Sequence, residues 1–79
     1  MKEREYVTKF LYRKAGETSY HLAERINGMI PNLVVGMFVH INEIGDFRVK
    51  SWDMSIDVRN ENTGHPGFVM INVILDEEV

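Results

Sequence analysis

The sequence contains no cysteine and only three histidines, which limits how the chain can be stabilised or made catalytic. Without cysteine there is no disulfide, no thiolate ligand and no thiol nucleophile. The histidines His21, His40 and His65 are far apart, and none has the i, i+4 partner typical of metal ligands on a helix. We therefore expect neither a metal nor any other cofactor.

Long apolar runs are also missing. Residues 1–5 are mostly charged, which argues against a secretory signal, and the longest apolar run, 67–75, is interrupted by Asn72. Neither approaches the ~20 apolar residues that a membrane-spanning helix needs. The 79 residues are enough for one domain, 1–79, with a small core. We expect a soluble cytoplasmic protein that does not engage a membrane.

Motifs of catalysis are absent as well. There is no G-x-S-x-G sequence, and the glycines around Gly64 precede a predicted strand, where no helix N-terminus can hold phosphate. Asp53 and Asp57 share one strand face, but four residues at ~3.4 Å separate them by roughly 14 Å, whereas a glycosidase pair needs roughly 5–9.5 Å. The sequence predicts no catalytic residues and no enzyme activity.

Charge is what the chain does have, and it is divided along the length. Residues 1–14 carry five bases against two acids, a charge of +3, and residues 15–79 carry four bases against ten acids, a charge of −6. The net charge is −3. A strongly acidic segment favours a partner with a basic surface.

Hydrophobic periodicity predicts one helix and four strands. Residues 5–13 alternate as a strand, with Tyr6, Phe10 and Tyr12 on one face. A helix is expected from Thr18 or Ser19 to about Ile30, because its apolar residues recur with helical spacing. That apolar stripe consists of Leu22, Ile26, Met29 and Ile30.

The remaining strands are predicted at 32–42, 47–59 and 68–76, joined by short turns as an antiparallel meander. Apolar residues of the third strand change phase near Lys50 and Ser51, which predicts a β-bulge there. Val69, Ile71, Val73 and Leu75 should form the inner face of the last strand. The expected fold is α+β, in the order β-α-β-β-β, with a four-stranded mixed sheet and one amphipathic helix packed on one face.

One helix of about 13 residues spans only ~20 Å and cannot cover both faces of this sheet. Apolar residues predicted on the second face therefore form a candidate interface, for a homodimer or another partner. They include Phe38, His40, Met70 and Ile74, with Val34 and Phe68 nearby. Coverage by loops and long side chains is the alternative.

Acidic residues form the main candidate binding site. Antiparallel pairing would bring Glu43 and Asp46 beside Asp76, Glu77 and Glu78 at one end of the sheet. A second group, Asp53, Asp57 and Glu61, follows the third strand and its loop. Carboxylates spaced along a surface can substitute for DNA phosphates, which follow one another at ~3.4 Å per strand. An ordinary solubilising surface is the alternative.

A short, cysteine-free, acidic chain of this kind resembles the small early proteins with which bacteriophages take over their hosts. Within that class it is similar to DNA-mimicking inhibitors, and the acids that carry the likeness are Glu43, Asp46, Asp53, Asp57 and 76–78. The resemblance implies a protein that binds a basic DNA-binding host protein, such as the nucleoid protein HU or RNA polymerase, and blocks its DNA site. If the chain is viral, it would act in the host cytoplasm.

Two alternatives remain open. One is a small oligomeric ligand-binding domain resembling the dodecins, in which Trp52 and nearby aromatic residues would stack a flat ligand. The other is direct RNA or single-stranded DNA binding through the N-terminal strand, where Lys9, Arg13 and Lys14 accompany aromatic rings. Lys2 and Arg4 would add to that basic surface. We do not favour direct nucleic-acid binding, because the domain is not basic overall.

Overall fold

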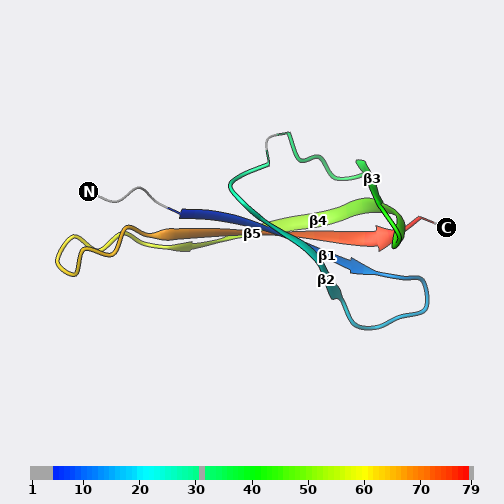
Figure 1. Ribbon diagram of the computed structural model, residues 1–79, viewed down its shortest axis with the longest axis horizontal. Coiled ribbons are helices and arrows are strands. Elements are labelled where there is room, and N and C mark those ends of the chain that lie inside the picture. The colour runs from blue at the N-terminus through cyan, green and yellow to red at the C-terminus, as the bar shows by residue number, and fades with distance from the viewer. Residues whose placement is uncertain (1–4, 31, 79) are drawn as a thin grey trace.

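The computed structural model describes residues 5–30 and 32–78, and these ranges contain five β-strands and no helix. The strands are β1 Glu5–Arg13, β2 His21–Asn27, β3 Phe38–Ile41, β4 Gly45–Asp57 and β5 Phe68–Glu77. They form one mixed sheet in the order β2-β1-β5-β4-β3 (Figure 1). Only β1 and β5 run parallel. The predicted α+β fold is therefore wrong, and the chain is all-β.

The segment predicted as a helix contains β2 instead. Phe10 of β1 lies opposite Glu24 and Leu11 lies opposite Leu22, so Ala23 is an extra residue that bulges out of β2. The bulge hides the two-residue alternation of the strand and leaves Leu22 and Ile26 at a spacing that imitates a helix. Both side chains are exposed, so no element buries the apolar stripe that a packed helix would require.

The strand predicted at 32–42 is much shorter, because only Phe38–Ile41 forms β3. The residues before it cross from the β2 edge of the sheet to the β3 edge (Figure 1). Gly36 has a φ of +92°, which favours glycine and interrupts the extended chain. The predicted meander is nonetheless confirmed, because β3, β4 and β5 pair antiparallel in sequence.

The predicted strands at 5–13, 47–59 and 68–76 correspond to β1, β4 and β5. Val49 lies opposite Leu75 and Ser51 lies opposite Ile74, so Lys50 is the bulged residue and the predicted bulge is confirmed. We call the face that carries the odd-numbered residues of β5 the inner face. Because of the bulge, residues on both sides of it share that face, as predicted; these are Phe47, Val49, Trp52, Met54 and Ile56.

The hydrophobic core occupies only part of the inner face. Phe47, Val49, Val73 and Leu75 are buried there, together with Val69 and Ile71 further along β5. The cover comes from the crossover, β3, the following turn and β1, through Leu33, Met37, Val39, Ile41, Ile44, Phe10 and Tyr12. β2 and β3, the two edge strands, curl toward each other over this end and line an open hollow with Ala23, Ile26, Val39 and Ile41.

Residues 51–72 form a long hairpin, which we call the arm; its β5 residues Val69 and Ile71 belong to the core and lie beside β1. The arm consists of the second half of β4, the loop 58–67 and the first half of β5, and it projects at the left of Figure 1. The molecule reaches 50 Å along its longest axis. Because the described ranges hold no helix, they hold none that could cross a membrane.

Thr8 fixes the start of the crossover. Its side chain is fully buried, and the Oγ1 hydroxyl donates a 2.8 Å hydrogen bond to the Gly28 carbonyl, just after β2. The Gly28 amide in turn donates to the Tyr6 carbonyl. A buried hydroxyl with a partner is stabilising, whereas a buried carbonyl that loses its donor is costly.

We expect Thr8→Val to lower the free energy of unfolding by about 1–2 kcal/mol, because the methyl group cannot donate to Gly28. Thr8→Ser is the matched control, since it keeps the hydroxyl and removes only a methyl group. Urea unfolding followed by circular dichroism measures both variants. A valine variant as stable as the wild type, or less harmful than the serine variant, would contradict this role for the hydroxyl.

Candidate interaction surfaces

Five predicted acidic residues do lie at one end of the sheet, as the antiparallel pairing suggested. We call this group the rim; it consists of Glu43, Asp46, Asp76, Glu77 and Glu78. Glu77 lies opposite Phe47 in the ladder, and the Glu78 amide donates a 3.0 Å hydrogen bond to the Asp46 carbonyl. Glu43 lies in the turn between β3 and β4 with a positive φ of 69°.

Lysine and arginine side chains pair with two of the five rim acids. Asp76 lies opposite Arg13 in the parallel ladder and forms ion pairs with Arg13 at 3.3 Å and with Lys50 at 3.6 Å. Arg48 pairs with Glu78 at 3.0 Å. Exposed ion pairs of this kind add little stability, but they cancel the long-range field of the carboxylates.

Asp46 and Glu77 of the rim also have polar contacts. His40 Nδ1 contacts Asp46, and the Glu77 carboxylate accepts a 3.1 Å hydrogen bond from the Ala15 amide. Tyr20 adds a hydroxyl to Asp76 at 3.2 Å. Four of the five rim acids, all except Glu43, therefore make polar contacts that help to tie β1, β4 and β5 together.

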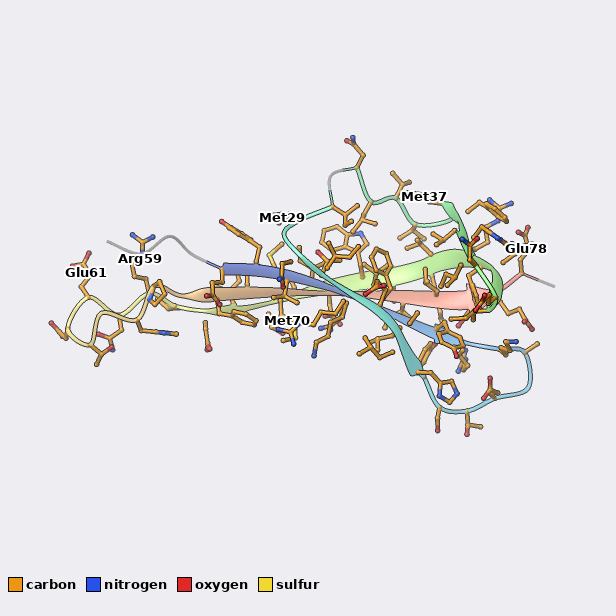
Figure 2. The ribbon with its side chains drawn as sticks, viewed as in Figure 1. Met29, Met37, Arg59, Glu61, Met70 and Glu78 are labelled. Atoms are coloured by element: carbon orange, nitrogen blue, oxygen red, sulfur yellow. The ribbon has the colours of Figure 1, made fainter. Side chains whose placement is uncertain are left out.

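The acids of the arm have no such compensation. Asp53 and Asp57 lie on the outer face of β4, opposite Asn72 and Phe68 of β5, as the predicted outward row requires. Asp53 accepts a 2.9 Å hydrogen bond from the Asn72 amide group, which carries no charge. Within the described chain, no ion pair involves Asp53, Asp57 or Glu61. Glu61 and Glu78 lie at opposite ends of the molecule (Figure 2).

On the inner face of the arm, the β4 residues are apolar and exposed, whereas Val69 and Ile71 of β5 are buried. The exposed fractions are 43% for Trp52, 43% for Met54 and 55% for Ile56, and Val58, which follows the strand, is 77% exposed. Tyr6 of β1, opposite Val69, adds a ring that is 37% exposed. Together they expose an area on the order of 400 Å², a size at which apolar patches mark interaction sites. The alternation of these residues alone could not show that burial along β4 ends at Val49.

The candidate apolar interface predicted on the second face is only partly exposed. Met70 and Ile74 do lie on the outer face, but neighbouring side chains leave them half-buried. Phe38 is exposed, with the Arg48 guanidinium 5.2 Å from its ring centroid. His40 contacts Asp46. Charged residues of the rim therefore interrupt this surface.

The bases and rings of the N-terminal strand lie on opposite faces. Tyr6, Phe10 and Tyr12 share the inner face, whereas Lys9 and Arg13 project from the outer face beside Asn72 and Asp76. A single strand of nucleic acid would need both kinds of side chain on one face. Lys2 and Arg4 lie outside the described residues.

Four hollows of the described residues are open, and Trp52 lines none of these four. Stacking of a flat ligand on Trp52 stays a prediction. Residues 5–30 and 32–78 also hold no group of three or more acidic and histidine side chains placed to bind a metal ion.

These observations define a class: a small mixed β-sheet with a compact end and an arm that is acidic on one face and apolar on the other. No protein-family model, curated protein or solved structure matches this chain.

Glu17, in the loop between β1 and β2, has a lowered pKa. The main cause is the hydrogen bond from His21 Nε2, 2.9 Å from Glu17 Oε2, which favours the charged carboxylate; the Lys14 amide also donates to the side chain. Because the folded pKa is lowered, the stabilisation is present above the unfolded value of about 4.5 and is lost as pH falls through the folded pKa.

We expect an NMR titration to place the Glu17 carboxyl pKa below 4.5 in the wild type and closer to 4.5 in His21→Ala, which removes the main donor. An unaltered Glu17 titration in His21→Ala would show that the ring does not stabilise the carboxylate.

Proposed function

We propose that this chain is a non-catalytic interaction protein that binds a basic nucleic-acid-binding protein through the acidic outer face of its arm and blocks the DNA site of that partner. The observation that supports it best is the contrast between the two acidic groups. In the rim, Asp76 and Glu78 pair with arginine or lysine side chains, whereas Asp53, Asp57 and Glu61 have no ion pair within the described chain.

The geometry of the arm suits such contact. It projects from the compact end, so its outer face is accessible along its length (Figure 1). Uncompensated carboxylates steer a basic partner at long range and then compete with DNA phosphates for the same lysines and arginines. The exposed apolar residues on the opposite face supply apolar contact area to an interface, which charged groups alone do not provide. Protein interfaces combine an apolar centre with a polar margin.

The nucleoid protein HU and RNA polymerase are the first partners to examine, because the acidic character resembles that of phage inhibitors of such proteins. Neutralising Asp53→Asn together with Asp57→Asn should weaken binding roughly tenfold, about 1.4 kcal/mol for the two charges. The loss should shrink as the salt concentration rises, because salt screens exposed charges. Competition against a fluorescent DNA duplex bound to each protein measures the effect.

The matched control is Asp76→Asn together with Glu78→Gln, which removes the same charge from the two rim acids that have basic partners and should change binding little. Capture from a bacterial lysate, with and without excess duplex DNA, extends the search to other basic proteins. The proposal fails if no DNA-binding protein is retained, or if the arm and rim variants bind equally well.

A further inference from the structure

The second half of β4 is an open sheet edge. Residues 51–57 pair with β5 on one side only. On the other side, the β3 ladder ends at Arg48, and the last backbone bonds join Val49 to Gly36 and Met37. Within the described chain, no strand continues beyond this point, so a row of backbone donors and acceptors faces outward.

Nothing in the sequence of this edge protects it in the usual ways. Proteins blunt exposed edges with proline, glycine bulges, lysines or a covering element, and residues 51–57 contain none of those three residue types. Its inner-face side chains, Trp52, Met54 and Ile56, are exposed and apolar. Only Asp53 and Asp57, on the outer face, discourage pairing with another strand.

We propose that this edge pairs antiparallel with the same edge of a second copy of the chain, about a two-fold axis through Met54. The side chains of the edge favour a second copy of the chain as the partner strand. Residues that lie opposite each other in an antiparallel pair have their side chains on the same face of the sheet, and side chains alternate along each strand. A two-fold axis meets both conditions only if it passes through a residue position and not between two positions. Few such registers exist for so short an edge.

The charges select among these registers. An axis through Ser55 would place Asp53 directly opposite Asp57 twice, and an axis through Asp53 would oppose two identical carboxylates, both of which are destabilising. An axis through Trp52 or Ile56 shortens the ladder. The axis through Met54 places Trp52 opposite Ile56, a favourable aromatic and β-branched pair, and gives each Asp53 a serine partner, Ser55.

The pairing of two copies does not depend on the proposed function. Its consequence for the acidic face does rest on the proposed function. With the axis at Met54, Asp53 and Asp57 of the two copies alternate along the joined edges at intervals of two residues, roughly 7 Å. That interval is about twice the ~3.4 Å axial rise of phosphates along one DNA strand. The dimer thus converts two isolated carboxylates into an evenly spaced row of four.

Disulfide trapping tests the register, because the chain has no cysteine of its own. In the proposed dimer, the two Cα atoms at position 54 face each other at about 5 Å, within disulfide range, whereas the two at position 55 are diagonal neighbours at roughly 7–8 Å. Under mild oxidation, Met54→Cys should form a covalent dimer at least about tenfold faster than the control Ser55→Cys. Equal rates, a faster Ser55→Cys, or no cross-link at position 54 would overturn the proposal.

Sedimentation equilibrium of charge variants provides the second measurement. Residue 51 lies opposite Asp57 of the second copy in the proposed register, so Ser51→Lys should strengthen the dimer and Ser51→Glu should weaken it. An axis through Ser55 would instead place residue 51 opposite Arg59 and reverse both signs. Reversed signs, no effect, or a wild-type chain that is monomeric at every concentration would refute this pairing.

Neither measurement includes a partner protein, so the two proposals can fail separately. Dimers with no affinity for basic proteins would leave the pairing intact and remove the proposed function. A monomer that still displaces DNA through Asp53 and Asp57 would do the reverse.

Discussion

The parallel pairing of β1 with β5 is the constraint on which the rest of the structure depends. It joins strands from the two ends of the described chain through nine consecutive residue pairs, from Glu5 opposite Phe68 to Arg13 opposite Asp76. The β1–β2 hairpin extends the sheet on one side, and the β3–β4–β5 meander extends it on the other. This central pairing closes a long loop, which adds a loop-closure entropy to the cost of ordering the chain.

This pairing also determines which charges meet. Arg13 and Asp76 are far apart in the sequence but adjacent in the sheet, and Lys50 reaches the same carboxylate from β4. The basic first strand therefore neutralises the acidic end of the last strand. Among the described residues, the division of charge along the sequence becomes an end where Asp76 and Glu78 have basic partners and an arm whose acids form no ion pair.

The strands predicted correctly from sequence are those in which apolar and polar residues alternate without interruption or change phase only once. β1 and β5 alternate without a break, and in β4 the apolar residues resume one position out of phase after Lys50. In β2 the bulge at Ala23 falls within only seven residues, most of which favour helices, so the pattern imitates an amphipathic helix. Local patterns could not reveal that β1 supplies hydrogen bonds to this segment.

The same limit applies to the candidate surfaces. The sequence places Asp53 and Asp57 on one face and brings the rim acids to one end, because both follow from strand direction and parity. It cannot show which acids acquire a cation, since that depends on the neighbour of each strand across the sheet. It also cannot show that the β4 residues on the inner face of the arm are exposed, because exposed and buried strand faces have the same alternation.

The bulge at Lys50 links the compact end to the arm. Before the bulge, β4 is paired on both sides and its inner-face residues Phe47 and Val49 are buried; after it, β4 is paired on one side and Trp52 and Met54 are exposed. Without the extra residue, Trp52 and Met54 would move to the outer face and Asp53 to the inner face, because one residue inverts the alternation of a strand. One bulge thus allows a single strand to build the core and to present separate apolar and acidic faces beyond it.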